Sequence, residues 1–421
     1  MSEGLRVFWH SAPPWVSTGY GILSKHITTR LRAHPEVMSA LAWLPLGGQM
    51  HAKHERDGIE LYPVIRPGEL GEDSVPRWSR HFKADIVVSI TDQWVWTRDV
   101  WKDLYWIPMA FPDHEPISSK MVNNLKMARH VVVPTEWGLG ALENAKVPHC
   151  RYIPLGIETG RFTANLSERA QQRASIIGAA RRQGAPYLTE DCFIFGMVAR
   201  NGTYPCRKGH DLVMDAVGQL LKRGHKDFIV YMHTMVDTSH GGVDLIAMVN
   251  AYGRLYQDAR LARHVLFPPC EQMHLGGHPD GYDDDRMRFL YNAMDCLVNP
   301  SQWEGFCLPV VEAAACGVPS IVTDAGCQPE TGAVGWKVPV YKHFYGPLSD
   351  AFVSEADLNG LVRTMETAMR EARRLELKEK ARRHAEKYDW DDIVEGHWVP
   401  FLLDVKASLG ARRKGLVAVG A

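Results

Sequence analysis

Two glutamates, Glu304 and Glu312, lie on either side of a tight loop that runs into a helix. An apolar strand ends before this loop, where residues 300–302 (Pro-Ser-Gln) break it. We expect Gly305 to allow an unusual backbone angle. Pro309 suits the first turn of a helix, because its missing N–H group would be unpaired there in any case. The spacing therefore predicts two carboxylates next to a helix N-terminus.

The helix after the loop is bounded by Gly317 and Pro319, and a buried strand is expected at 320–323. In a parallel α/β sheet this puts the unpaired N–H groups of residues 306–308 at the carboxyl edge, where phosphates bind. A carboxylate at the same place suits hydroxyl groups better than phosphate. The pattern therefore suggests a sugar nucleotide as the ligand. The alternative is a plain strand–loop–helix connection with two surface glutamates.

Residues 301–324 resemble the Glu-x7-Glu signature of retaining glycosyltransferases of the GT-B fold, family 4, also called glycosyl transferases group 1. The resemblance implies that Glu304 contacts the donor sugar and Glu312 the ribose. Cys307 stands where the family usually has glycine, so we expect its side chain to crowd the sugar or pyrophosphate pocket. The residues implied for the donor-binding turn are Gly305, Phe306, Cys307 and Leu308.

A second motif, residues 198–212, follows a predicted strand and resembles the Gly-Arg-x4-Lys-Gly element of the same family. The resemblance implies that Arg200 and Lys208 clamp the donor diphosphate. Two cations at the end of a strand neutralise phosphate and stabilise a leaving diphosphate. Because this loop is longer than usual, Arg207 is a candidate to share or replace the role of Arg200. The alternative is a solvated basic turn.

Two weaker motifs lie in the first half of the chain. Residues 11–23 contain Gly19 and Gly21 and resemble the glycine loop with which the family covers the donor phosphates; the alternative is a simple strand–helix turn. Asp113 and His114 follow another strand, at a position where the family often has an acid or histidine facing the sugar and acceptor. These two residues either join Glu304 as the implied catalytic group or only fix their loop.

Tryptophans also gather after a strand of the first half. Trp94 and Trp96 follow Asp92 at the expected end of the strand at 85–90. Exposed indole rings there would stack on a sugar or a base. Packing in an aromatic-rich core is the alternative.

The chain has 421 residues, which suits two domains. Strands alternating with helices predict an α/β fold with two doubly wound, Rossmann-like domains. The resemblance implies that these domains face each other across a cleft. We expect an N-terminal domain on the acceptor side at 1–160, a connection at 161–191, a donor-binding domain at 192–388, and a helix at 389–421 that returns to the first domain and ends in a frayed tail.

Composition excludes several classes of protein. A net charge of −1 excludes a broadly basic, nucleic-acid-binding surface, and eight scattered cysteines fit a reducing compartment. The first residues lack an apolar signal core and no run is long enough to span a bilayer, so we expect a cytoplasmic protein. We expect no metal site: residues 283–285 (Asp-Asp-Asp) are interpreted as a helix cap, and His274 and His278 flank two glycines.

The resemblance implies a retaining, metal-independent glycosyltransferase without a cofactor. Its substrate would be a nucleoside-diphosphate sugar, such as a UDP- or GDP-sugar, and its acceptor a hydroxyl of a glycan, a small molecule or a modified DNA base. The alternatives are a sugar-nucleotide epimerase or a glycosyl phosphorylase of the same fold, or a non-catalytic sugar-nucleotide-binding module. The sequence leaves the sugar, the nucleotide, the acceptor and the oligomeric state open.

Overall fold

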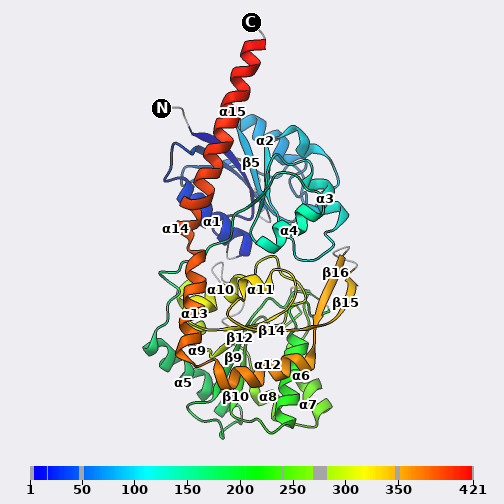
Figure 1. Ribbon diagram of the computed structural model, residues 1–421, viewed down its shortest axis with the longest axis vertical. Helices are drawn as coiled ribbons and strands as arrows, with labels where there is room; N and C mark the ends of the chain where they lie inside the picture. Colours follow the sequence, from blue (N-terminus) through cyan, green and yellow to red (C-terminus); the bar gives the residue numbers. More distant parts are fainter. Residues whose placement is uncertain are drawn as a thin grey trace. The chain divides into compact units, whose positions relative to one another are not determined.

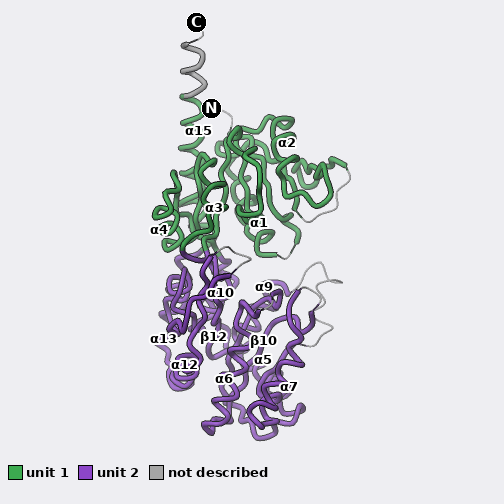
Figure 2. The backbone as a smooth tube through the Cα atoms, turned by 90° about the vertical axis from the view of Figure 1, so that its right-hand side faces the viewer, with its two compact units in different colours: residues 1–112, 116–156, 389–421 green, residues 113–115, 157–388 purple. Residues whose placement is uncertain are grey.

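The computed structural model describes residues 4–16, 18–46, 52–203, 205–238, 241–268, 282–346 and 351–419. The chain forms two compact units (Figure 2). Unit 1 comprises residues 1–112, 116–156 and 389–421, and unit 2 comprises residues 113–115 and 157–388. Each unit is built on its own parallel sheet, as the alternation of strands and helices in the sequence predicts.

Unit 1 contains an eight-stranded sheet in the order β3-β4-β2-β1-β5-β6-β7-β8. Figure 1 labels one of its strands, β5. Neighbouring strands run parallel, except β3 and β4, which are antiparallel. Strands such as β5 are buried along their whole length, as parallel strands covered by helices must be. The strands are β1 (Leu5–Ser11), β2 (Met38–Pro45), β3 (His54–Arg56), β4 (Ile59–Leu61), β5 (Ile86–Ile90), β6 (Trp106–Met109), β7 (Val131–Val133) and β8 (Cys150–Tyr152).

The last segment of the chain completes the core of unit 1. Trp390 lies against Gly156, where an added Cβ would clash with the indole ring, and Trp398 lies 6.5 Å from Trp9 between ring centroids. The helices of unit 1 are α1 (Gly19–Leu31), α2 (Ser74–Phe82), α3 (Ser119–Leu125), α4 (Glu136–Asn144), α14 (Trp390–Ile393) and α15 (Val399–Val419), with 3-10 turns at Gln93–Val95 and Val100–Asp103 and a π turn at Val394–Trp398.

Unit 2 contains a six-stranded parallel sheet in the order β11-β10-β9-β12-β13-β14. The apolar runs of the sequence predict strands at 193–198, 228–233, 296–299 and 320–323, and four strands of this sheet have these bounds. Strand β14 was not predicted. The strands are β9 (Phe193–Val198), β10 (Phe228–His233), β11 (Val265–Leu266), β12 (Cys296–Asn299), β13 (Ser320–Thr323) and β14 (Gly335–Val338). The helices are α5 (Leu166–Arg182), α6 (His210–Lys222), α7 (Leu245–Tyr256), α8 (Leu261–His264), α9 (Asp284–Ala293), α10 (Leu308–Ala315), α11 (Gln328–Thr331), α12 (Leu358–Glu371) and α13 (Leu375–Ala385).

Helix α5 belongs to unit 2, although we expected residues 161–191 to be a connection between domains. Arg169 and Arg173 of α5 form ion pairs with Asp295, whose side chain is fully buried. Arg373 pairs with the same carboxylate. Burial alone would raise the pKa of Asp295, but the three guanidinium groups lower it to about 2. These charges fix α5 to the sheet, and the polar sequence of the helix gave no sign of this anchor.

A two-stranded antiparallel hairpin, β15 (Val340–Gly346) and β16 (Ala351–Ala356), follows β14. It was not expected from the sequence. The backbone N–H of Ser354 donates to the carbonyl oxygen of Gln302, at 3.3 Å. The hairpin is thus attached to the loop that follows β12, next to Glu304.

Candidate functional site

The loop after β12 is held by buried polar contacts. Ser301 is fully buried, and its carbonyl oxygen accepts a hydrogen bond from Thr323 Oγ1 at 2.8 Å. The Ser301 hydroxyl donates to the carbonyl oxygen of Arg207, at 3.3 Å. The loop at 300–307 and the turn at 205–209, which the sequence singled out separately, therefore lie side by side.

The sharp turn of this loop falls at Cys307 and not at Gly305. Cys307 is the N-cap residue of α10 and has a left-handed backbone, with φ of 74° and ψ of 68°. Gly305, where we expected an unusual angle, has no positive φ. A left-handed angle costs a residue with a Cβ about 1–2 kcal/mol. This cost explains physically why a glycine suits the position of Cys307.

Glu304 and Lys208, which come from different motifs, form an ion pair. Lys208 Nζ contacts Glu304 Oε1, and the two side chains are only 16% and 7% exposed. Burial alone would raise the pKa of Glu304, but the charges of Lys208 and Arg207 outweigh it and hold the pKa below its usual value. Glu304 is thus a buried, charged carboxylate at neutral pH, with its cation in place.

The two arginines of the basic motif differ in how they are held. Arg207 Nη1 donates to the carbonyl oxygen of Trp303, at 2.8 Å, and its guanidinium lies over the Trp303 ring, 5.2 Å from the centroid. Arg200 is exposed, lies close to Gly202, and has no ion-pair partner within the described ranges. Arg207 therefore supports the loop, whereas the side chain of Arg200 is available to an anion from solution.

Glu312 lies in α10 and faces Tyr291 of α9. The Tyr291 hydroxyl donates to Glu312 Oε2 at 2.6 Å, and Tyr291 is fully buried. Burial raises the pKa of Glu312 to about 7, although the hydrogen bond from Tyr291 lowers it. Sequence reasoning missed Tyr291. Its place next to Leu290, on the face of α9 that enters the core, could have identified it as a buried polar group in need of a partner.

Asp113 and His114 form a pair of their own. Asp113 Oδ1 contacts His114 Nδ1, while the buried Nε2 of His114 has no hydrogen-bond partner in the described structure. Both residues belong to unit 2. Burial raises the pKa of the Cys327 thiol, and the charges of Glu304 and Asp113 raise it further. Cys327 Sγ donates to the carbonyl oxygen of Glu304 at 2.9 Å, so Asp113 acts on a thiol that contacts the loop.

The residues singled out in unit 1 have different roles. Gly19 is exposed, with open space where a Cβ would be, so a ligand can approach its backbone. Gly21 is buried, and a Cβ there would clash with the carbonyl oxygens of Pro13 and Val16, so its glycine is required by packing. Trp96 is also a core residue, only 3% exposed, whereas Trp94 is 46% exposed.

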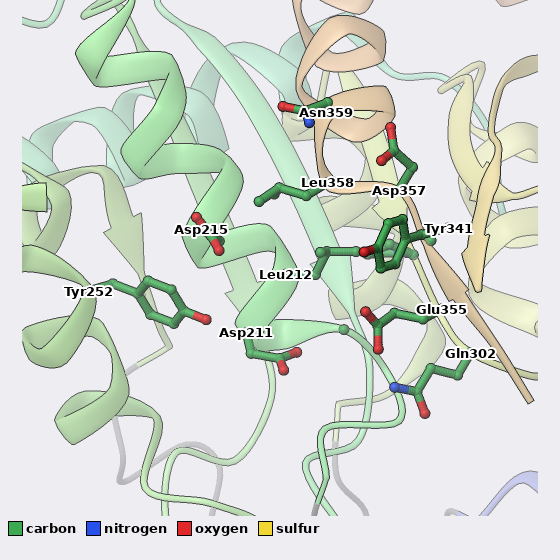
Figure 3. A pocket seen from close by; sticks show the side chains of 13 residues that line it. Asp211, Leu212, Asp215, Tyr252, Gln302, Tyr341, Glu355, Asp357, Leu358 and Asn359 are labelled. Atoms are coloured by element: carbon green, nitrogen blue, oxygen red, sulfur yellow. The ribbon is translucent and has the colours of Figure 1, made fainter. Parts of the chain in front are cut away.

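A cavity of about 420 Å³ lies in unit 2 beside Gly209 and Gln302 (Figure 3). Carboxylates dominate its wall, and they would repel a diphosphate. This cavity is therefore not suited to an anionic ligand. The charged and aromatic residues that line the cavity are Asp211, Asp215, Glu355, Asp357, Tyr252 and Tyr341.

The acidic run at 283–285 has a structural role. Asp283 caps α9 by accepting a hydrogen bond from the backbone N–H of Arg286, and Asp284 and Asp285 form ion pairs with Arg161. Over the described ranges, no group of three His, Cys, Asp or Glu side chains is arranged to hold a metal ion. His274 and His278 lie outside the described residues. Nor does this part of the chain contain a helix long and apolar enough to cross a membrane.

Residues 193–344, which include the motifs at 198–212 and 301–324, match the family glycosyl transferases group 1. A D-inositol 3-phosphate glycosyltransferase of Gordonia bronchialis is 31% identical over 296 residues, which cover 63% of this chain and 59% of that protein. The mannosyltransferase WbdA of Escherichia coli is 33% identical over 108 residues, 25% of this chain and 12% of that protein. Proteins from Rhodococcus erythropolis and Corynebacterium jeikeium with the same name as the Gordonia protein are matched over 23% and 36% of their length.

Solved structures share the fold over nearly the whole chain. Sucrose-phosphate synthase from Thermosynechococcus elongatus superimposes with a TM-score of 0.68 at 16% identity, over 97% of this chain and 100% of that one. A glycosyltransferase from Rickettsia africae superimposes with a TM-score of 0.67 at 14% identity, over 95% of this chain and 98% of that one. These structures show that the chain has the GT-B fold, and the family match covers residues 193–344 within it.

Proposed function

We propose that this protein is a retaining glycosyltransferase that moves a sugar from a nucleoside-diphosphate sugar to an acceptor hydroxyl, without a metal ion in the donor site. The observation that carries the proposal is the buried Lys208–Glu304 ion pair directly before the N-terminus of α10. It brings a cation, a carboxylate and unpaired backbone N–H groups to one place. A phosphate joined to a polyol requires these three kinds of group.

The diphosphate of the donor would bind to the cations and the helix N-terminus. The N–H groups of Phe306, Cys307 and Leu308 lie at the start of α10, where no intrahelical acceptor exists. Lys208 would turn from Glu304 to a phosphate oxygen, and the exposed Arg200 would bind another. Glu304, released from its partner, then accepts hydrogen bonds from hydroxyls of the sugar. The resting ion pair thus keeps both charges stable until the donor replaces it.

In the proposed reaction the acceptor oxygen attacks the anomeric carbon from the face that the diphosphate leaves. The new carbon–oxygen bond forms as the bond to the diphosphate breaks, and the acceptor proton passes to an oxygen of the leaving diphosphate. The products are a glycoside of unchanged anomeric configuration and a nucleoside diphosphate. Lys208 and Arg200 would stabilise the charge that develops on the leaving group.

We assign His114 and Asp113 to the orientation of the sugar or the acceptor. When His114 is neutral and donates from Nδ1 to Asp113, its buried Nε2 is a hydrogen-bond acceptor. A hydroxyl group is the partner that suits such an atom in this reaction.

A screen of donors and acceptors tests the proposal. Purified protein is incubated with UDP-, GDP- and ADP-sugars and with hydroxyl acceptors, among which inositol phosphates and mannosides are included because relatives carry these words in their names. We expect a nucleoside diphosphate to be released only when donor and acceptor are both present, and the product to keep the anomeric configuration of the donor by NMR. Inversion of the configuration, or release that needs no acceptor, would contradict the proposal.

A further inference from the structure

The carboxylate of Glu312 has one fixed oxygen and one free one. Oε2 accepts the hydrogen bond from Tyr291 at 2.6 Å, whereas no partner of Oε1 is found in the described part of the chain. Among the residues that the structure describes, Glu312 forms no ion pair. Tyr291 is itself fully buried between the helices and stacks edge-on against Phe162, with ring centroids 6.1 Å apart. The phenol is therefore rigid and aims its single donor at Glu312.

Few groups around Glu312 favour its charge. Burial and the charge of Asp284 raise the pKa of Glu312, and the Tyr291 hydrogen bond lowers it. Arg288 and Arg382 lie near the following turn, where they act on the thiol of Cys316. The titratable groups that interact with Glu312 are Asp284 and Tyr291 from α9 and Cys307 and Cys316 from the ends of α10, whereas Arg288 of α9 and Arg382 of α13 act on Cys316.

We propose that Tyr291 is a positioning residue for donor binding: its hydroxyl fixes one oxygen of Glu312, favours the carboxylate over the acid, and leaves the other oxygen free to accept hydrogen bonds from the ribose of the donor. The proposal rests on the proposed function. A diol binds best to an oriented, charged acceptor, and a hydrogen bond to a charged group is the stronger kind. Without the phenol, Glu312 would be both less ordered and more often protonated.

Tyr291→Phe tests this role, because it removes only the hydroxyl. We expect the KM for the donor to rise about 10- to 100-fold at pH 7, the size expected for one hydrogen bond to a charged group, with a smaller change in kcat. Donor affinity should increase with pH around 7 in the wild type, as Glu312 loses its proton. In Tyr291→Phe this rise should move to higher pH, which a purely structural role of Tyr291 would not produce.

Two further variants make the test specific. Tyr256→Phe removes another phenol–carboxylate hydrogen bond of unit 2, to Asp215, and should leave the donor KM and its pH profile unchanged. Glu312→Asp keeps the charge but shortens the reach to Tyr291, so it should weaken donor binding as much as Tyr291→Phe does. Glu312→Asp also carries the test if Tyr291→Phe does not fold.

The outcomes separate this inference from the proposed function. If the wild type transfers sugar while Tyr291→Phe, or Glu312→Asp in its place, has the wild-type KM and pH profile, the role of Tyr291 is refuted and the glycosyltransferase stands. If the wild type neither binds nor turns over any nucleoside-diphosphate sugar, the proposed function fails first and this inference fails with it.

Discussion

Substitution of Cys307 tests how much strain the loop before α10 holds. Cys307→Gly removes the steric cost of φ at 74°, whereas Cys307→Ala keeps it. Both variants lose the sulfur atom, so their difference isolates the backbone. A left-handed angle costs a residue with a Cβ about 1–2 kcal/mol, and the greater freedom of glycine in the unfolded chain offsets about 0.5–1 kcal/mol of this. We therefore expect the glycine variant to be more stable than the alanine variant by roughly 0.75 kcal/mol.

Thermal unfolding followed by circular dichroism measures this difference. For a domain of 150–250 residues, 1 kcal/mol changes Tm by about 2–4 °C, so the expected gap is about 2 °C. Cys316 provides the control, because it is also a cysteine at an end of α10 but has φ of −80°. At position 316, where φ is negative, Cys316→Gly should be less stable than Cys316→Ala. An alanine variant at 307 that is as stable as the glycine variant, or more stable, would refute the argument from strain.

Four further predictions follow from the site and the core. Lys208→Ala should weaken donor binding about 10- to 100-fold, measured by calorimetry, and it should lower Tm because Glu304 is left buried without its partner. Lys222→Ala, at an exposed position, is the control, and an unchanged donor affinity of Lys208→Ala would remove Lys208 from the site. Glu304→Gln should lower kcat, whereas Glu312→Gln should mainly raise the KM for the donor. A wild-type kcat for Glu304→Gln would refute the contact of Glu304 with the donor sugar. Turnover should survive EDTA; its loss, with recovery on adding Mg²⁺ or Mn²⁺, would mean that the site uses a metal. Burial lowers the pKa of His10 from 6.5 to about 3. Between these pH values the unfolded state binds more protons than the folded state, so the stability of the fold falls as the pH drops through this window. His10→Leu should therefore flatten the dependence of Tm on pH between 7 and 5, and an unchanged slope would contradict this prediction.

The sequence was most informative where local rules act alone. The strand at 296–299, the break at Pro300 and the helix ended by Gly317 all follow from residue types within one segment, and the structure has them at the expected positions. The ion pair between Glu304 and Lys208 joins two motifs 96 residues apart. Resemblance selected both residues, but only the structure shows that they contact each other.

Other features depend on tertiary contacts that no local pattern contains. An unusual backbone angle was expected at Gly305, because glycine permits one, whereas the left-handed angle of this loop lies at Cys307. The sequence of helix α5 is typical of a polar connection. Its role in the fold is not visible locally, because the partner of Arg169 and Arg173 is a single buried carboxylate more than a hundred residues later. The role of Gly21 was likewise hidden, since the backbone that it contacts lies in the preceding loop.

Residues 157–388 of unit 2 separate the last segment of unit 1, residues 389–421, from the rest of that unit, which has a consequence for biosynthesis. Trp390, Trp398 and Phe401 supply core side chains to a sheet whose strands lie within residues 5–152. On the ribosome, residues 157–388 are synthesised before residues 389–401, so unit 2 can begin to fold while unit 1 still exposes apolar surface. A nascent chain stalled near residue 388 should therefore be the species that recruits chaperones or aggregates. A fragment of residues 1–156 made alone should share this weakness, and adding residues 389–411 in trans should relieve it.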